Sequence, residues 1–264
     1  MADLVPDNRL EGDITDQQPV APPRATVGIV FSTPQEAGGT VDRLTDAETL
    51  RGENITEHRG TIQQQHVAVL QSGIGPQRAA AATHDLIRNH HPDWVISAGF
   101  ATALRPGIRL GHIVMPNQIR AGDAESSVGL VFDDDALKST PGLITGVLLQ
   151  QTDDNLTPDH KRRFGESTDA VACDEVSFAV AEVCQQRKTK FLCVRVITET
   201  AEEQVSLRTQ KLLRQPTLWA KLGAATGALW DKPSTAKELW QIKSRQLQAS
   251  DGLAKFLQGV FAQL

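Results

Sequence analysis

The chain has 264 residues, of which 40% are hydrophobic and 22% are charged, and its formal net charge is −5 at pH 7. This length and apolar content fit one large folded domain. The negative charge balance and the scattered basic residues argue against a nucleic-acid surface. No apolar run reaches the roughly 20 residues that cross a bilayer.

The first segment, residues 1–25, differs in composition from the rest of the chain. It combines acidic residues with the prolines Pro19, Pro22 and Pro23, and it has few large apolar side chains. Such a stretch cannot bury enough surface to offset the entropy lost on ordering. We therefore expect a disordered acidic and proline-rich tail over residues 1–25 and one folded domain over residues 26–264.

From residue 26 onward, short β-branched runs alternate with helical segments, which is typical of an α/β protein. The expected strands are Val27–Phe31, a strand around Ile55, Val67–Leu70, Trp94–Ala98, His112–Met115, Ile144–Leu149, Ala170–Cys173 and Phe191–Ile197. The expected helices open at Thr33–Glu36, run from Pro76 to about Asn89, and cover Glu175–Gln186. This order predicts a central mixed β-sheet with helices on both faces.

Beyond Glu203 the sequence pattern is wholly helical, so we expect a C-terminal helical extension from about residue 206. One apolar helix is marked by Leu218, Trp219, Leu222, Leu229 and Trp230. A second helix follows Pro233, where Thr235–Glu238 has the pattern of a capping box. Its apolar stripe at helical spacing consists of Leu239, Ile242, Leu247, Leu253, Phe256, Leu257 and Val260. We expect these helices to cover the sheet or a subunit interface.

The cysteines and histidines form no metal-binding pattern. Cys173, Cys184 and Cys193 lie among apolar residues, without a Cys-x-x-Cys pair or a histidine cluster. Thiols of this kind fit a reducing cytoplasm. We therefore expect a cytoplasmic protein with no metal site and no cofactor.

Several strands end in glycine or small polar residues, and in open α/β sheets ligands sit at the carboxyl ends of the strands. In order and spacing these pieces resemble the purine nucleoside phosphorylase and nucleosidase superfamily, most closely its branch of 5′-methylthioadenosine/S-adenosylhomocysteine nucleosidases. The resemblance spans roughly residues 26–203 and implies a phosphorylase/hydrolase-like three-layer sandwich. The pieces that carry it are Val27–Val30 with Glu36 following, Ser72–Gly75, Ser97–Ala101, Gly111–Val114, and Phe178–Ala181 through Val194–Glu199.

The reaction that this resemblance implies is cleavage of the N-ribosidic bond between a purine and its sugar. The oxocarbenium-like transition state requires an acid at purine N7, a group that activates water or binds phosphate, and contacts to the ribose hydroxyls. Glu36 stands where the family carries the glutamate that activates water, and Glu199 stands where it carries the aspartate that acts as the acid. The residues alone leave a second interpretation for each. Thr33–Glu36 also fits a capping box, and Glu199 also fits an exposed acid beside Glu202 and Glu203.

The substrate-binding candidates form two groups. Ser72, Gly73, Ile74 and Gly75 make a strand-to-helix turn, whose equivalent in phosphorylases holds phosphate or sugar oxygens, as helix N-termini readily do. The resemblance places the others against the base or the sugar: Gly99, Phe100, Asp174, Glu175, Val176 and Thr198.

Some positions depart from the family pattern. Val176 stands where relatives carry the glutamate that binds the ribose 2′- and 3′-hydroxyls, and Glu175 stands where they carry a methionine. A valine side chain accepts no hydrogen bond, and neighbours on a helix point about 100° apart. Phe100–Ala103 replaces a small-residue turn with residues that adopt positive φ poorly, and His112 replaces an aspartate. These departures indicate a drift in substrate or a loss of activity.

The sequence thus predicts a nucleosidase-like enzyme that releases adenine from a 5′-modified adenosine. Two alternatives stay open. One is a phosphorolytic enzyme, resembling purine nucleoside phosphorylases or hopanoid-associated phosphorylases; the other is a degenerate protein that binds a purine nucleoside without cleaving it. The expected partners are a small-molecule purine nucleoside and, for phosphorolysis, phosphate, with no nucleic acid and no membrane. Because the family is commonly dimeric or larger, the resemblance also implies a homo-oligomer.

Overall fold

The computed structural model describes residues 25–53, 55–122, 126–129, 140–152, 156–205 and 233–264. Its helices are α1 (Pro34–Val41), α2 (Pro76–His90), α4 (Pro158–Thr168), α5 (Ser177–Arg187) and α8 (Pro233–Phe261). Its strands are β1 (Val27–Phe31), β2 (Thr45–Arg51), β3 (Thr56–Ile62), β4 (Gln65–Gln71), β5 (Trp94–Ala103), β6 (Ile113–Val114), β7 (Gln118–Ala121), β8 (Ser126–Gly129), β9 (Leu143–Ile144), β10 (Val147–Gln150), β11 (Ala170–Asp174) and β12 (Lys190–Glu199).

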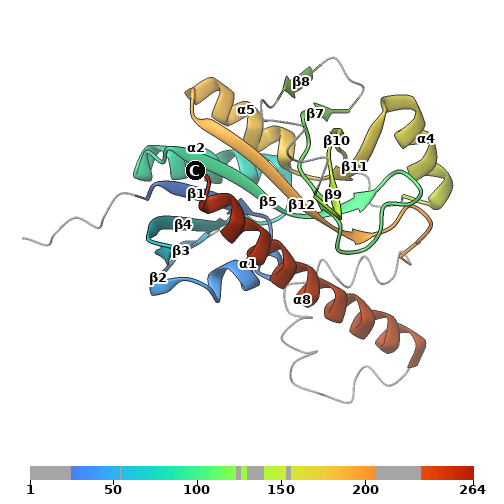
Figure 1. Ribbon diagram of the computed structural model, residues 1–264, viewed down its shortest axis with the longest axis horizontal. Coiled ribbons are helices and arrows are strands. Elements are labelled where there is room, and N and C mark those ends of the chain that lie inside the picture. Colours follow the sequence, from blue (N-terminus) through green and yellow to red (C-terminus); the bar gives the residue numbers. More distant parts are fainter. Residues whose placement is uncertain (1–24, 54, 123–125, 130–139, 153–155, 206–232) are drawn as a thin grey trace, which may run out of the picture.

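The described strands form one mixed sheet in the order β2-β3-β4-β1-β5-β11-β10-β7-β8, and β12 pairs with β5 and with β6. β4, β1, β5 and β12 run parallel to their neighbours in this set, so their carboxyl ends meet at one edge. β11 runs antiparallel to β5 and meets it at Thr102–Ala103. Helices α2 and α5 cover one face of the sheet, and α1 and α8 cover the other (Figure 1). This is the three-layer α/β architecture that the sequence predicts.

The alternation of side chains along β1 explains the two faces. Ile29 and Phe31 belong to the core cluster that α8 closes with Leu253 and Leu257. Val30 points the other way, into the cluster that α2 and α5 close. Successive residues of a strand face opposite sides of the sheet, and β1 lies between two parallel strands, so all five of its residues are buried. Its uninterrupted apolar run is therefore the expected pattern for a central parallel strand.

The predicted strands are confirmed in part. β1 has the predicted bounds, α2 extends one residue beyond its predicted end, and β12 exceeds its prediction by one residue at the start and two at the end. The run Ile144–Leu149 is split into β9 and β10 because Gly146, with φ at +140°, breaks the strand. The residues Phe100–Ala103, which replace the small-residue turn of the family pattern, continue β5, so none of them needs a positive φ.

Four elements were not predicted: β2, β7, β8 and α4. β2 consists of exposed residues at the sheet edge, and α4 is mostly polar, so neither carries an apolar period. Helix α5 begins at Ser177 rather than at Glu175. Helix α8 begins at Pro233, before Thr235, so the predicted capping box at its start is wrong.

The C-terminal prediction also changes in detail. In the expected stripe of α8, Leu239, Leu253 and Leu257 are buried, but Leu247 is 62% exposed. The apolar helix predicted around residues 218–230 and residues 1–24 of the predicted tail lie outside the described residues. Ala25, the last residue of that segment, is buried in the core cluster under α2 and α5.

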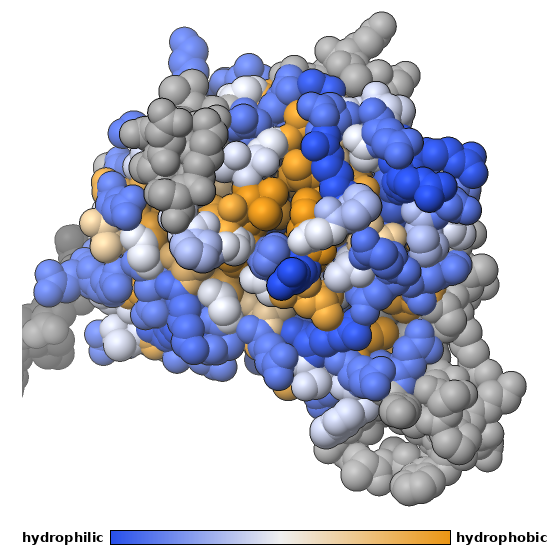
Figure 2. All heavy atoms as spheres, turned by 45° about the vertical axis from the view of Figure 1, so that its right-hand side comes forward, coloured by the Kyte–Doolittle hydropathy of each residue, from blue (hydrophilic) through white to orange (hydrophobic). Residues whose placement is uncertain are grey.

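The surface carries apolar side chains as well as charges. On the face seen in Figure 2, apolar side chains gather near the centre and polar side chains surround them. Across the described residues, the exposed large hydrophobic residues are Leu50, Ile74, Leu110, Trp240, Leu247 and Leu264. Within that same part of the chain, no helix is long and apolar enough to cross a membrane.

Candidate active site

A cavity of about 260 Å³ opens at the carboxyl ends of β1, β5, β11 and β12. Its position follows from the topology, because parallel strands end at the same edge and β11 meets β5 there from the opposite direction. The side chains that line it are Ser32, Thr33, Glu36, Ile74, Phe100, Ala101, Thr102, Cys173, Asp174, Glu175, Val176, Arg195 and Thr198. Seven of the residues predicted from the sequence are in this set: Glu36, Ile74, Phe100, Asp174, Glu175, Val176 and Thr198.

Glu36 is a buried carboxylate that faces this cavity from the first turn of α1. Its Oε2 accepts hydrogen bonds from the Thr33 backbone N–H at 2.8 Å and from the Thr33 hydroxyl at 3.0 Å. The Glu36 N–H is 3.3 Å from the Thr33 hydroxyl, which completes a capping box. Oε1 accepts from the Phe100 N–H at 2.9 Å. The two interpretations of Glu36 therefore coexist, because the same carboxylate caps α1 and lines the cavity.

Burial raises the pKa of Glu36 above the ordinary value for a glutamate. The Phe100 N–H, the positive charge of Arg195 and the Thr33 donors act in the opposite direction, but burial has the larger effect. A carboxylate with a raised pKa is a stronger base than a solvated one. Glu36 is thus suited to accept a proton inside the cavity.

Gly99 lies close to the Glu36 carboxylate, and its lack of a side chain makes room for it. A Cβ atom at this position would lie 2.6 Å from Oε1 of Glu36 and 3.4 Å from a guanidinium nitrogen of Arg195. Real Cβ atoms essentially never approach another atom as closely as 2.6 Å. Gly99 is not among the residues that line the cavity, and its missing side chain leaves the space that the Glu36 carboxylate occupies.

Arg195 on β12 was missed by the sequence reasoning. Its side chain is buried, and its Nε donates to Asp174 Oδ2 at 2.9 Å. One terminal nitrogen donates to the hydroxyls of Ser97 at 2.6 Å and Ser177 at 2.8 Å. The sequence offered one signal, an arginine inside the otherwise apolar strand Phe191–Ile197. A buried charge is costly unless polar groups pair with it, so such an arginine indicates a cluster of polar partners.

Asp174 connects this arginine to helix α5. Its Oδ2 accepts from the Ser177 hydroxyl at 2.7 Å and from the Ser177 N–H at 3.1 Å. Carboxylates at helix N-termini satisfy free N–H groups and favour the helix dipole. Asp174 therefore fixes Arg195 and the start of α5 together, and its oxygens are committed to these contacts.

The departures from the family pattern lie on the same wall. Val176 is buried within the apolar cluster under α2 and α5 while lining the cavity. Glu175 is half-buried and contributes a carboxylate to the lining. The wall thus holds one valine, which cannot accept a hydrogen bond, beside one carboxylate that can.

The turn Ser72–Gly75 lies beside the cavity and joins β4 to α2. Gly73 and Gly75 adopt positive φ of 80° and 104°. The Ser72 hydroxyl is turned inward and donates to the Phe31 carbonyl at 3.2 Å and the Gly73 carbonyl at 3.0 Å. Ile74 contributes the lining side chain, and Gly75, the N-cap residue of α2, provides no side-chain cap. The N–H groups of its first turn are those that helix N-termini present to anions.

Cys173 is the thiol of the lining. Burial raises its pKa well above the ordinary range, and the neighbouring Asp174 carboxylate adds to this effect. A thiol in such surroundings is not ionised at neutral pH and is a poor nucleophile. Within the described residues, no group of three or more His, Cys, Asp or Glu side chains could hold a metal ion.

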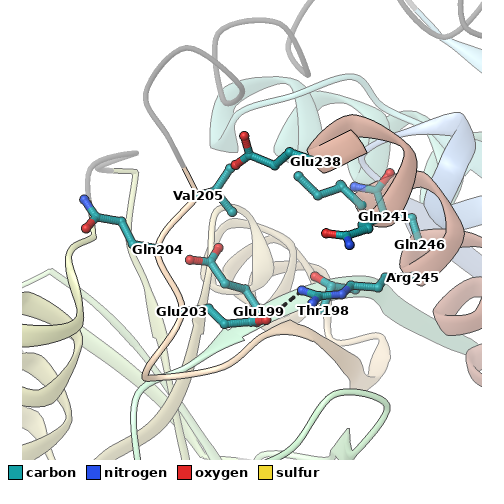
Figure 3. A pocket seen from close by; sticks show the side chains of 10 residues that line it. Thr198, Glu199, Glu203, Gln204, Val205, Glu238, Gln241, Arg245 and Gln246 are labelled. Carbon is teal, nitrogen blue, oxygen red and sulfur yellow. Dashed lines mark hydrogen bonds and ion pairs between the residues drawn. The ribbon is translucent and has the colours of Figure 1, made fainter. Parts of the chain in front are cut away.

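Glu199 is not in the lining of the Glu36 cavity. It lines a second cavity of about 270 Å³ between the end of β12 and α8, and Thr198 is shared by both cavities (Figure 3). An ion pair holds its Oε1 2.5 Å from Nζ of Lys161, a fully buried residue of α4. On the far side, Arg245 of α8 reaches Glu203 at 2.7 Å. The structure thus brings Glu36 and Thr198 together and places the Glu199 carboxylate beyond Thr198.

Comparisons with known proteins show the family to which the chain belongs. A family model described as the phosphorylase superfamily matches residues 26–177. The 5′-methylthioadenosine/S-adenosylhomocysteine nucleosidase of Staphylococcus haemolyticus is 24% identical over 214 residues, which are 71% of this chain and 92% of that protein. The nucleosidase of the same description from Shewanella loihica is 26% identical over 204 residues, covering 66% and 86%.

Solved structures show the same fold. The 5′-methylthioadenosine/S-adenosylhomocysteine nucleosidase of Helicobacter pylori matches with a TM-score of 0.68 and 17% identity, covering 91% of this chain and 99% of that one. The corresponding Campylobacter jejuni structure matches with a TM-score of 0.70 and 13% identity, covering 91% and 100%. At these identities the structural likeness concerns the fold alone.

Proposed function

The chain belongs to the phosphorylase superfamily, and we propose that it cleaves the N-ribosidic bond of a 5′-modified adenosine and releases adenine. The observation that carries this proposal is Glu36, a buried carboxylate whose raised pKa suits a base and which faces a cavity at the strand ends. The curated relatives support it, since both are described as nucleosidases for 5′-methylthioadenosine and S-adenosylhomocysteine.

In the proposed mechanism Glu36 takes a proton from a water molecule, which attacks the anomeric carbon as the bond to the purine breaks. The electron pair of that bond stays on the purine, which takes up a proton from solvent and leaves as neutral adenine. Arg195 holds a buried positive charge beside Glu36 and is itself fixed by Asp174 and two hydroxyls. This charge opposes protonation of Glu36 and keeps the carboxylate available as a base. The ionised Glu36 that Arg195 maintains is the preorganised negative charge that favours the positive charge developing on the sugar.

The base and the sugar are assigned to opposite ends of the cavity. We assign the purine to the side where Thr198 and Glu199 end β12, and the ribose to the wall of Glu175 and Val176. We assign the ribose hydroxyls to the Glu175 carboxylate, which lines this wall, since Val176 cannot accept a hydrogen bond. The 5′-group is open: the structural neighbours include a nucleosidase with 5′-methylthioadenosine and a futalosine hydrolase mutant, both from Helicobacter pylori.

Two alternatives have specific support. The uncapped first turn of α2 beside Ile74 favours an anion, so phosphate could replace water as the nucleophile. The burial of Val176 at the family's ribose-binding position favours a protein that binds nucleosides without cleaving them. Hydrolysis has the stronger support, because Glu36 offers a base within the cavity and the curated relatives are nucleosidases.

The test measures adenine release from 5′-methylthioadenosine, S-adenosylhomocysteine and other 5′-substituted adenosines, with and without phosphate. Glu36→Gln should lower turnover by about 100- to 10,000-fold, the usual contribution of a general base, while nucleoside binding changes little. Because burial raises the pKa of Glu36, the parent's turnover should fall as the pH drops through this raised value, since the protonated form is no base. The exposed Glu166→Gln is the control. Dependence on phosphate would select phosphorolysis, and binding without release would select the degenerate binder.

A further inference from the structure

Lys161 is a buried charge that the proposed reaction does not use. It lies on α4, its side chain is fully buried, and its ammonium group contacts the segment that follows β12. Nζ lies 2.5 Å from Glu199 Oε1, 2.9 Å from the Thr200 carbonyl oxygen and 2.7 Å from the Glu203 carbonyl oxygen. A lysine ammonium has three N–H donors, so three acceptors use all of them.

This complete pairing determines what Lys161 can do. With every N–H committed, the side chain has no donor left for a ligand and cannot serve as a proton donor without breaking a contact. A fully buried ammonium is costly unless it is paired in this way. Lys161 is therefore a fixed anchor, and what it fixes is Glu199 together with the turn at Thr200–Glu203.

A second set of contacts holds the same turn from the other side. The Thr200 N–H donates to Glu203 Oε2 at 3.0 Å, and Arg245 of α8 donates to Glu203 Oε1 at 2.7 Å. Figure 3 shows the strand end and α8 facing each other across the second cavity. Helices α4 and α8 thus both contact the segment of residues 198–203. Its first residue, Thr198, lines the cavity that Glu36 faces, which is called the nucleoside cavity below.

We propose that Lys161 is a positioning residue for the Thr198 wall of the nucleoside cavity, acting through Glu199. The ammonium fixes the Glu199 carboxylate outside this cavity, and Glu199 directly follows Thr198, which lines it. The ion pair therefore sets where Thr198 lies at the end of the cavity to which we assign the base. This inference rests on the proposed function for the identity of the ligand, but the anchoring of the turn by Lys161 does not.

The experiment is a double-mutant cycle on the full chain with Lys161→Met, Glu199→Gln and the double variant. Titration calorimetry gives the affinity for adenine, and hydrogen exchange gives the protection of the amides at residues 198–203. Each single variant should weaken adenine binding by about 10- to 100-fold, the range for a hydrogen bond to a charged group. The double variant should be no weaker than the worse single variant, because Lys161 acts through Glu199.

Arg162→Met is the matched control, since Arg162 is the next residue of α4 and its exposed side chain pairs with Asp159. It should leave adenine binding and amide protection unchanged. If Lys161→Met does not fold, Lys161→Met/Glu199→Leu removes both charges and leaves no unpaired carboxylate. Faster exchange confined to residues 198–203 in either variant supports the anchoring.

Three results would overturn the inference. They are additive losses of adenine affinity in the cycle, unchanged exchange at residues 198–203 in a folded variant without Lys161, and equal effects of Arg162→Met. A parent that neither binds adenine nor releases it would refute the proposed function instead. The exchange of the turn amides would still decide whether Lys161 anchors them.

Discussion

Gly99→Ala tests whether the position of the Glu36 carboxylate, rather than its presence, sets the rate. The added Cβ would lie 2.6 Å from Glu36 Oε1, whereas an ordinary contact begins at 3.4 Å. One of the two groups must therefore move by about 0.8 Å, and a misplacement of about 1 Å can cost roughly 100-fold in rate. Because the φ of Gly99 is not in the left-handed region, alanine there is not strained by its backbone.

Gly28→Ala is the matched control for overpacking. Its Cβ would also meet a side-chain tip at 2.6 Å, but this tip is a methyl group of Leu86 in the core. Overpacking of either kind costs about 1–3 kcal/mol of folding stability. We expect both variants to melt at lower temperature, and only Gly99→Ala to lose kcat/KM for adenine release, by about 100-fold.

The assay compares initial rates of adenine release at saturating and limiting nucleoside, with melting temperatures from the same preparations. A folded Gly99→Ala variant with kcat/KM within about threefold of the parent, well below the loss expected from misplacement, would refute the placement of Glu36. An equal loss in Gly28→Ala would show that general destabilisation, and not the carboxylate, is being measured.

Three further variants test an ion pair and the helix packing outside the site. Burial opposes ionisation of Glu57, but hydrogen bonds from His90 and a neighbouring arginine outweigh it and lower the pKa to about 2. Glu57→Gln should therefore lower the free energy of unfolding by about 1–2 kcal/mol near pH 7, after allowance for partial exposure. The difference in stability between parent and variant should shrink as the pH falls below about 4.5 and vanish near pH 2. A difference that does not change with pH in acid unfolding would contradict this. Gly39→Ala would place a Cβ 2.4 Å from the Ser250 carbonyl oxygen and should lower the melting temperature. Gly38→Ala has its nearest contact at 3.9 Å and should raise the stability by about 0.4–1 kcal/mol. Equal shifts in both melting temperatures would refute close packing of α1 on α8.

The parts of the fold that the sequence predicts are those governed by local pattern. β1 and β12 are apolar runs buried on both sides, and α2 has a proline in its first turn. β2 and α4 gave no such signal, because β2 is an exposed edge strand and α4 buries few residues. Their positions are set by pairing with β3 and by contact with β11, which are tertiary relations.

The same distinction applies to the site. Glu36 could be predicted because it follows the first strand and opens a helix, two features that are adjacent in sequence. Lys161 could not be predicted as a site residue, because a charged residue in a sequence is usually solvated. Arg195 was missed for the same reason, although its place inside an apolar strand was a signal. Their burial depends on partners about 20 to 100 positions away, such as Asp174 and Ser97 for Arg195, and Glu199 for Lys161.

The charged residues of the cavity also hold the secondary structure that surrounds it. Glu36 completes the capping box of α1 while facing the cavity, and Asp174 accepts a hydrogen bond from the first residue of α5 while fixing Arg195. A substitution at either position therefore removes hydrogen bonds at a helix start in addition to any chemical role. Because these helix starts lie at the carboxyl ends of strands, the geometry that builds the fold also concentrates negative charge at the cavity. The buried Arg195 balances that charge, so removal of the arginine should affect Glu36 and Asp174 together, and their contributions cannot be separated by single substitutions alone.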